Sequence, residues 1–514
     1  MGQRTAIGLT GDDLSIADVW AVAVERAPVG LTDGAREKMR RARELVERAA
    51  HGTREHTYGV NTGFGRFVNR SIPEELTEEL QLRLLRSHAC GVGEPYADEI
   101  VRAAMLLRAN TLAKGNSGAR VETVELLLDC LERGVLPVVP SRGSVGASGD
   151  LAPLAHLALP LVGEGEAFLD GERLPGFEAL TRAELEPTRL EAKEGLSLIN
   201  GTQFMAAFLA LGLVRARRLA RAADLACAQS LEALQGSRTS FLPQIHALRP
   251  LRGQADAAAN VLRLLEGSAV IESHRWCDKV QDAYSLRCAP QVHGASRDLL
   301  DYADYTVSVE LNAATDNPLV LVEDDALFSN GNFHGQPLAF ALDALAMAAA
   351  ELASISERRI ERLVNPNLSD GLPAFLTSDG GLNSGFMIPQ YVAASLVSEN
   401  KVLCHPASVD SIPTSAGQED HVSMGNASGL KAWQVVANSE RALAIELLAG
   451  AQAVEFLAPL EPGRGARATH AFVRTLSARL RDDRSLSEDI EAVATAVRDG
   501  SLLADVESEV GELE

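Results

Sequence analysis

The stretch PLAFALDALAMAAAELASIS (residues 337–356) indicates the fold more clearly than any other part of this 514-residue chain. It predicts a helix with alanine and leucine on every side, whereas an amphipathic surface helix confines its apolar residues to one stripe. The helical pattern continues to residue 364, and similar runs cover residues 203–234 and 428–456, so we predict three long helices that are buried on several sides. A membrane span is the competing interpretation of the first run, but Asp343 and Glu351 interrupt it.

The composition agrees with a helical fold. Hydrophobic residues make up 46% of the chain and aromatic residues only 4%, a mixture that favours packed helices over sheets. We predict a mainly α protein with a large central bundle of long helices, extended by oligomerisation. Residues 1–200 should form a smaller mixed region, and residues 201–514 should hold the bundle and a C-terminal helical region.

Smaller elements can be placed around the bundle. Thr32 is a suitable N-cap for a helix that follows it, and Asp150 can cap a helix that begins at Leu151. A small hairpin is predicted around Asp324 and Asp325, in the run PLVLVEDDALFSNGNF (318–333). The acidic tail ADVESEVGELE (504–514) is expected to fray.

Charge and cysteine content exclude several classes of function. The formal net charge of −22 excludes non-specific binding to nucleic acid, which needs a basic surface. The six cysteines form no CxxC pair, which argues against a zinc site and a disulfide framework. The first residues include acids and form no apolar run, which is unlike a signal peptide. We therefore expect a reduced, cytoplasmic protein without a membrane span.

The short run Gly146-Ala147-Ser148-Gly149-Asp150 is the candidate for chemistry. A serine-hydrolase elbow needs G-x-S-x-G, but Asp150 stands where the last glycine should be. A phosphate-binding loop needs a lysine that is missing here. On this motif alone, a glycine-rich turn before an N-cap remains open.

The same residues allow a backbone segment to condense with itself. The amide nitrogen of Gly149 can attack the carbonyl carbon of Ala147 with loss of two waters, one of which carries away the Ser148 hydroxyl. The product is methylidene-imidazolone, an electrophile that needs no external cofactor. Gly149 and Ala147 are small enough for the close approach that this reaction requires.

A longer run, GSVGASGDLAPLAH (143–156), resembles the signature of the aromatic amino-acid ammonia-lyase family. The resemblance covers roughly residues 10–500 and keeps the order of the family's motifs. It implies a carbon–nitrogen lyase with a fumarase/aspartase-like helical architecture and a homotetramer whose active sites are shared between subunits. The other matching motifs are TYGVNTGFG (57–65), RSHACGVG (86–93), KEGLSLINGTQ (193–203), CDKVQDAYSLRCAPQV (277–292), NAATDNPL (312–319), GNFHGQP (331–337), NSGFMIPQ (383–390) and SVDSIPTSAGQEDHVSM (408–424).

The resemblance assigns roles to individual residues. Tyr58 matches the family's tyrosine base, in a loop (Gly59–Gly65) suited to close over substrate. Arg287 matches the arginine that grips the substrate carboxylate, and Tyr284 and Gln281 match residues that position substrate and electrophile. Tyr58, the 281–287 segment and Glu419 are expected to come from different subunits.

Further matches concern the electrophile and the choice of substrate. Asn200 matches the asparagine beside the electrophile, and Phe333 matches an aromatic wall around it. His88 and Glu419 resemble the histidine-directed branch of the family, and they make a poor lining for a phenyl ring. The implied reaction is non-oxidative elimination of ammonia from L-histidine to give trans-urocanate.

Other activities compete with this interpretation. A tyrosine or phenylalanine ammonia-lyase or a 2,3-aminomutase would use the same electrophile, and Gly335-Gln336 resembles the aminomutase branch. A metal hydrolase lacks its H-E-x-x-H spacing here. A pyridoxal enzyme would need a lysine beside a phosphate cradle, which neither Lys193 nor Lys279 has. A non-enzymatic helical scaffold would leave Ser148 unmodified.

Overall fold

The computed structural model of the chain describes residues 6–52, 58–60 and 62–514. The chain forms two compact units, each assembled from separate parts of the sequence. Unit 1 is made of Met1–Leu211, Asp304–Asp343 and Pro406–Leu430, and unit 2 of Gly212–Ala303, Ala344–His405 and Lys431–Glu514. The expected division into residues 1–200 and 201–514 stays a prediction.

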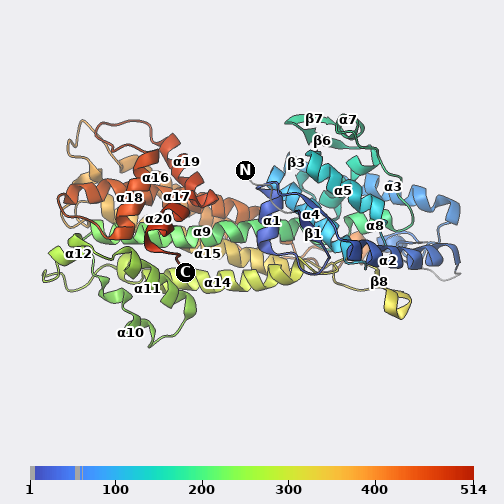
Figure 1. Ribbon diagram of the computed structural model, residues 1–514, viewed down its shortest axis with the longest axis horizontal. Coiled ribbons are helices and arrows are strands. Elements are labelled where there is room, and N and C mark those ends of the chain that lie inside the picture. The colour runs from blue at the N-terminus through green and yellow to red at the C-terminus, as the bar shows by residue number, and fades with distance from the viewer. Residues whose placement is uncertain (1–5, 53–57, 61) are drawn as a thin grey trace. The chain divides into compact units, whose positions relative to one another are not determined.

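Long helices dominate the structure and confirm the prediction of a mainly α fold (Figure 1). The runs at 203–234, 337–364 and 428–456 form α9 (Gln203–Ala233), α15 (Gln336–Val364) and α17 (Gly425–Val454). A further long helix, α14 (Ala289–Glu310), was not expected from the sequence.

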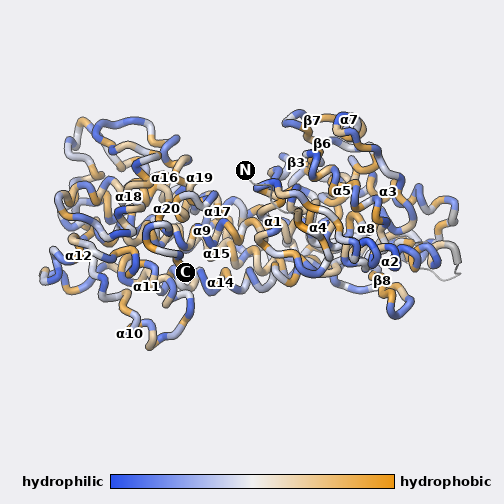
Figure 2. The backbone as a smooth tube through the Cα atoms, in the orientation of Figure 1, coloured by the Kyte–Doolittle hydropathy of each residue, from blue (hydrophilic) through white to orange (hydrophobic). Residues whose placement is uncertain are grey.

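Helix α15 consists largely of apolar residues, most of which are buried (Figure 2 colours the chain by hydropathy). The consecutive residues Ala344, Leu345 and Ala346 are all buried, which requires neighbours on several sides of the helix. By length and composition α15 could cross a membrane, but 72% of its most apolar window is buried within the fold. Core helices of globular proteins share this composition, so α15 alone is weak evidence for a membrane span.

Buried charged groups join the long helices within unit 2. The guanidinium of Arg359 on α15 donates to both carboxylate oxygens of Glu446 on α17, and all these groups are fully buried. His293 on α14 lies 2.7 Å from Asp224 on α9, and Arg359 donates to the other nitrogen of the same imidazole. Because each buried charge needs its partner, these contacts favour one packing of the helices.

Unit 1 surrounds its share of the long helices with shorter helices and small sheets. β1 (Ile7–Leu9) pairs with β2 (Val29–Leu31) in parallel, while β3–β5, β4–β6–β7 and the β8–β9 hairpin are antiparallel. Thr32 caps α2 through a hydrogen bond from the Ala35 amide to its hydroxyl, as predicted. The remaining bounds are α1 (Ile16–Ala23), α2 (Asp33–Gly52), α3 (Thr77–His88), β3 (Val92–Pro95), α4 (Asp98–Ala113), α5 (Val121–Arg133), β4 (Leu136–Pro137), β5 (Pro140–Arg142), α6 (Leu151–Ala158), β6 (Glu166–Leu169), β7 (Glu172–Pro175), α7 (Gly176–Arg182), α8 (Glu194–Ile199), β8 (Leu319–Leu321) and β9 (Ala326–Phe328).

Unit 2 adds shorter helices to the bundle, and its C-terminal tail is ordered. The expectation of a frayed tail is wrong, because α20 covers Ser501–Val510 and the Glu514 amide donates to the Asn260 side chain. Asn260 and Arg297 both donate back to the Glu514 carbonyl oxygen. The other helices of unit 2 are α10 (Pro243–His246), α11 (Arg252–Leu264), α12 (Ala269–Ser273), α13 (Tyr284–Arg287), α16 (Met387–Leu403), α18 (Arg464–Leu476) and α19 (Ser487–Asp499).

Candidate active site

The loop that carries Ala147, Ser148 and Gly149 lies in unit 1, between β5 and α6. Gly149 has a φ of +74°, which glycine adopts without strain. It pairs with Gly201, and a Cβ on Gly149 would lie 2.0 Å from the Gly201 carbonyl oxygen. Only glycine therefore fits at position 149, and the loop is pressed against the segment that precedes α9.

Asp150 holds this loop in place in a way that the sequence did not predict. Asp150 is the N-cap residue of α6, but its side chain makes no capping bond there. Its Oδ2 instead accepts from the Phe204 and Met205 amides in the first turn of α9, at 3.0 Å each. Its Oδ1 accepts from the Ser144 hydroxyl at 2.9 Å. Burial raises the pKa of Asp150 to about 6.

Ser148 is contacted on both its side chain and its carbonyl group. Its hydroxyl donates to Oε1 of Glu419 at 2.9 Å, and the hydroxyl of Thr414 donates to Oε2 at 2.6 Å. The side-chain amide of Asn200 donates to the Ser148 carbonyl oxygen at 2.9 Å. Within the described part of the chain, the buried Oδ1 of Asn200 has no hydrogen-bond partner.

Tyr58 belongs to the same unit, and its hydroxyl accepts a 3.5 Å hydrogen bond from the Gly65 amide. Burial raises the pKa of its phenol, and the negative charges of Glu419 and Asp316 raise it further, while the Gly65 amide opposes them. These surroundings favour the neutral phenol. The predicted lid, Gly59–Gly65, includes Asn61, which lies outside the described residues.

His88 ends α3, and its neighbours determine which ring nitrogen carries the proton. Nδ1 lies 2.9 Å from both the Leu84 carbonyl oxygen and the Ser87 hydroxyl oxygen. The carbonyl oxygen can only accept and the Ser87 hydroxyl donates to it at 3.0 Å, so this arrangement is satisfied when Nδ1 carries the proton. Burial lowers the pKa of His88, while the Leu84 carbonyl and the Glu419 charge act in the opposite direction. The neutral ring therefore keeps Nε2 as a hydrogen-bond acceptor.

Phe333 is half-buried in a turn that is tied to the loop of Ser148. The Gly335 amide donates to the Gly146 carbonyl oxygen at 3.4 Å. Nε2 of His334 lies 3.1 Å from the His421 carbonyl oxygen, to which it donates. The turn is thus fixed between the electrophile loop and the segment that follows Glu419.

Gln281, Tyr284 and Arg287 belong to unit 2. The guanidinium of Arg287 lies 4.7 Å from the centre of the Tyr284 ring, and its Nε donates to the Asp282 carbonyl oxygen at 2.9 Å. Gln281 is exposed, and Tyr284 is 71% exposed. A helical turn, α13, brings Tyr284 and Arg287 together, as the spacing of three predicts.

Unit 1 thus brings together Tyr58, His88, Ser148, Asn200 and Glu419 in one chain. We expected Tyr58 and Glu419 to come from different subunits, and this expectation is corrected: Glu419 contacts Ser148 and acts on the pKa of Tyr58 within a single chain. The loops that carry these residues all fold into the same compact unit.

Sequence reasoning missed two residues that support this group. Thr414 holds Glu419, but nothing in its surrounding sequence singles it out. Arg108 donates to the Asn200 carbonyl oxygen at 2.7 Å from the interior of α4. A charged residue within the apolar run of α4 is a signal that could have identified Arg108.

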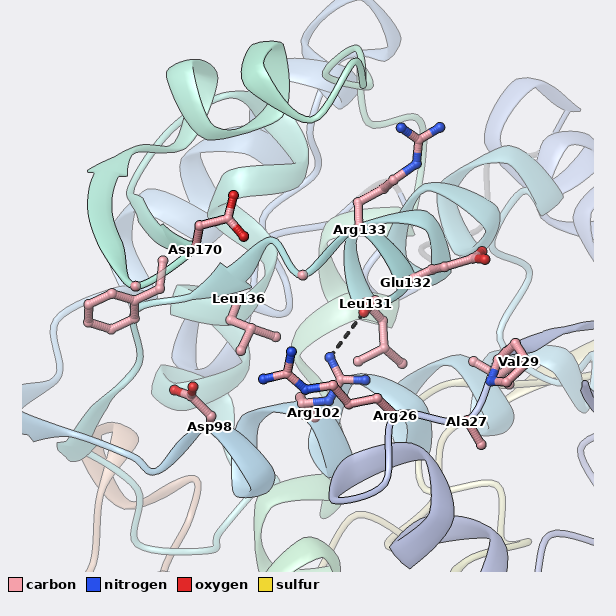
Figure 3. Close-up of a pocket in the computed structure, with 14 residues that line it drawn as sticks. Arg26, Ala27, Val29, Asp98, Arg102, Leu131, Glu132, Arg133, Leu136 and Asp170 are labelled. Carbon is pink, nitrogen blue, oxygen red and sulfur yellow. Dashed lines mark hydrogen bonds between the residues drawn. The ribbon is translucent and has the colours of Figure 1, made fainter. Parts of the chain in front are cut away.

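A cavity of about 660 Å³ in unit 1 shares no lining residue with this group (Figure 3). Arg102 lies in this cavity, but its guanidinium is used to cap helix ends. It donates to the carbonyl oxygens of Val22 and Ala23 at the end of α1 and of Leu131 near the end of α5. The cavity is therefore separate from the candidate active site.

Comparison with known proteins places the chain in a family. Residues 14–475 match the family described as aromatic amino acid lyase. The chain is 58% identical over 506 residues to a histidine ammonia-lyase of Gloeobacter violaceus, with 98% of each chain covered. It is 55% identical to a histidine ammonia-lyase of Symbiobacterium thermophilum, covering 98% of this chain and 99% of that one.

Solved structures agree with the sequence comparison. The structure of histidine ammonia-lyase from Trypanosoma cruzi has a TM-score of 0.91 at 45% identity, covering 99% of this chain and 96% of that one. A tyrosine aminomutase from Streptomyces globisporus has a TM-score of 0.94 at 39% identity, covering 99% and 100%. The family match spans most of the chain and several relatives cover nearly all of it, so the chain belongs to the aromatic amino acid lyase family.

Proposed function

We propose that this chain is a histidine ammonia-lyase, which eliminates ammonia from L-histidine to give trans-urocanate, the first step of histidine degradation. The observation that carries the proposal is the pair of contacts on Ser148, to Asn200 and to Glu419. They place an amide donor and a carboxylate on the residue whose hydroxyl must leave. The histidine ammonia-lyases that match over nearly the whole chain support the same conclusion.

The residues present fit the methylidene-imidazolone that the family resemblance implies. Gly149 lies where any Cβ would collide with Gly201, so the position whose nitrogen must attack Ala147 admits only glycine. Ala147 is buried and small, and Ser148 is positioned by its carbonyl and its hydroxyl. When formed from Ala147-Ser148-Gly149, this group supplies an electrophile that turns the substrate amine into a better leaving group.

The chain's own residues supply the remaining chemistry. Asn200 donates to the Ser148 carbonyl oxygen and stabilises negative charge there. Tyr58 is the proposed base for the substrate β-proton. Both charged groups that act on its hydroxyl are carboxylates and favour the protonated phenol, so its activation requires a nearby cation. Arg287 of the partner subunit would supply one while it holds the substrate carboxylate.

His88 and Glu419 select the substrate side chain. Since Nε2 of His88 accepts a hydrogen bond, it suits a side chain that presents a donor, such as the N–H of an imidazole. Glu419 offers a carboxylate to the same imidazole. A phenyl ring presents no donor and would leave both groups unpaired, which costs binding energy. Phe333 is the proposed aromatic wall of this pocket.

Shared sites in a homotetramer follow from the distribution of residues and from exposed apolar faces. Arg287, Tyr284 and Gln281 belong to unit 2, whereas Tyr58, His88, Ser148, Asn200 and Glu419 belong to unit 1, and we propose that a neighbouring subunit brings the unit 2 residues to the electrophile. On α14, the exposed Tyr305 and Val309 are four residues apart and share one face. On α15, the exposed Phe340 and Met347 are seven residues apart and also share a face. Such apolar faces are typical of subunit interfaces.

Tyrosine is the nearest competing substrate, because a phenol O–H can also donate to Nε2 of His88. The similarity to a tyrosine aminomutase and the Gly335-Gln336 pair favour a tyrosine lyase or a 2,3-aminomutase as the second candidate. A cytoplasmic location stays a prediction from the sequence.

The test is to incubate the purified chain with L-histidine, L-tyrosine and L-phenylalanine in parallel. We expect urocanate, followed by its ultraviolet absorbance, and one ammonia for each urocanate formed. A β-amino acid from tyrosine, without ammonia, would instead identify an aminomutase. Intact mass should be lower than the encoded mass by two water molecules, and an unchanged mass would rule out the electrophile.

A further inference from the structure

Arg108 is a buried cation directly behind the segment that supports the electrophile loop. It lies on α4 and is fully buried. Its Nη1 donates to the Asn200 carbonyl oxygen at 2.7 Å and to Oε1 of Gln203 at 3.1 Å. Both acceptors are neutral oxygens, although a buried guanidinium is normally paired with a carboxylate.

The charge of Arg108 is left largely uncompensated. Among the described residues, its Nε and Nη2 have no hydrogen-bond partner. Asp316 is the carboxylate whose charge acts on it, but Oδ2 of Asp316 accepts a 2.7 Å bond from the equally buried Lys193. Burial lowers the pKa of Arg108 to about 10, so the group is still charged at neutral pH. An uncompensated buried charge is costly, and such costs occur at functional sites.

The Asn200–Gly201 segment lies between Arg108 and the electrophile loop. On one side, the Asn200 amide contacts the Ser148 carbonyl oxygen and the Gly201 carbonyl accepts from the Asp150 amide at 2.7 Å. On the other side, a Cβ on Gly201 would lie 2.6 Å from Nη1 of Arg108. Arg108 therefore packs directly against this peptide and also donates to its Asn200 carbonyl oxygen.

We propose that Arg108 is a positioning residue for the proposed reaction: it fixes the Asn200–Gly201 peptide, so that the Asn200 amide stays on the Ser148 carbonyl oxygen and the loop can condense. Arg108 acts through Asn200 and does not contact the substrate. The kinetic test of this inference rests on the proposed function. The second test, which measures by intact mass whether two waters have been lost, depends only on the condensation of Ala147-Ser148-Gly149.

The experiment compares Arg108→Met and Arg108→Lys with the wild type. In Arg108→Met, we expect kcat, normalised to the condensed fraction, to fall by about 10- to 100-fold with little change in KM, because displaced catalytic groups cost about this much. A fraction of the Arg108→Met chains should also remain uncondensed, with an intact mass that still includes the two waters. Arg108→Lys retains a cation and a donor, so it should recover most of both losses.

Arg102 offers a matched control on the same helix. It is also buried and also donates to backbone carbonyl oxygens, one of them that of Leu131 (Figure 3). Arg102→Met should lower the melting temperature as Arg108→Met does, since both changes leave buried carbonyl oxygens unpaired. Its kcat and its loss of two waters should equal those of the wild type.

A double-mutant cycle separates positioning from general destabilisation. If Arg108 acts through Asn200, Arg108→Met should cause no further loss of kcat in an Asn200→Ala chain. If the two substitutions lower kcat by factors that multiply in the double variant, the proposal is overturned. It is also overturned if Arg108→Met keeps the wild-type kcat and every chain loses the two waters. If the wild type fails to convert histidine, the proposed function fails, and the comparison of masses still decides the role of Arg108.

Discussion

The hydroxyl of Ser148 donates to Oε1 of Glu419 at 2.9 Å, although 270 residues separate them in the sequence. Thr414 fixes the other oxygen of the same carboxylate at 2.6 Å. The carboxylate is therefore held beside the group that must leave when the loop condenses. The contact also brings the segment that selects the substrate to the segment that forms the electrophile.

Replacing Ser148 by alanine should abolish the reaction without unfolding the chain. Alanine has no hydroxyl to eliminate, so no methylene can form, and we expect turnover to fall by at least about 1,000-fold. Ser148 is only half-buried, and its hydroxyl makes a single side-chain hydrogen bond before condensation, so the alanine chain should keep the fold and melt in one transition close to that of the wild type. Intact mass, turnover and thermal melting measured on one preparation check all three expectations.

The neighbouring Ser144 provides the control for this substitution. Its hydroxyl binds Asp150 at 2.9 Å but is not a leaving group. Ser144→Ala should still lose two waters. A Ser148→Ala chain that turns histidine over at the wild-type rate would contradict the mechanism.

Replacing His88 by phenylalanine should change the choice of substrate. The substitution removes the Nε2 acceptor and adds a ring that packs against phenyl groups. We expect the ratio of kcat/KM for histidine to that for phenylalanine to fall by roughly 10- to 200-fold. The measurement is kcat/KM for both amino acids on one preparation.

His405→Phe makes the same chemical change at an exposed position that belongs to unit 2, and it should leave the ratio unaltered. If His88→Phe also leaves the ratio unaltered, His88 has no part in specificity.

Much of the fold could be predicted because its signals are local. Apolar residues on every side mark α9, α15 and α17 in the sequence, and the structure places these helices within a few residues of the expected bounds. Helix α14 carries Pro290 and Gly294, which weaken a helical pattern. Gly294 is explained only by packing, because a Cβ there would lie 2.3 Å from the Gln254 backbone nitrogen on α11.

The site was only partly predictable, because its contacts are not local in the sequence. The motif around Ser148 has a recognisable pattern, but the partners of its residues are distant in sequence. Asp150 caps α9 and not α6, because the loop folds back onto the first turn of α9. Arg108 stands out in the sequence as a charge within the apolar run of α4, but its role is seen only from the Asn200 carbonyl group beside it. Such tertiary contacts leave no local pattern in one sequence.

Glu232 should make the stability of unit 2 depend on pH. Its carboxylate is buried on α9, where it accepts from the Gly463 amide at 2.8 Å, and burial raises its pKa from 4.5 to about 7. A raised folded-state pKa means that the protonated form favours folding. This contribution is fully present below pH 4.5 and is lost as the pH rises to about 7, and it amounts to about 3 kcal/mol at most.

Glu232→Gln keeps an oxygen for the Gly463 amide but cannot ionise. We expect the variant to match the wild type at pH 5 or below and to melt at a higher temperature at pH 8, each pH being set in the experiment. Glu461→Gln, two residues before Gly463 and on a side chain that is 70% exposed, is the control and should show no such difference. Equal melting temperatures for Glu232→Gln and wild type at the higher pH would contradict the argument.

Mixed oligomers test whether neighbouring subunits share the site. Ser148→Ala chains keep Arg287 but lack the electrophile, and Arg287→Ala chains have the reverse defect, so each should be inactive alone. If unit 1 of one subunit uses Arg287 of the partner subunit, some sites in co-expressed mixtures contain both intact groups. Random mixing in equal amounts predicts recovery of roughly a quarter of wild-type activity, since both halves must be intact at one site.

A mixture of Ser148→Ala with Asn200→Ala is the control: both residues act within one unit, where Asn200 contacts Ser148, so no mixed site is complete. Activity in that control would show that the sites are not divided between subunits in this way. The same conclusion would follow if the mixture with Arg287→Ala is inactive although native mass spectrometry detects mixed oligomers.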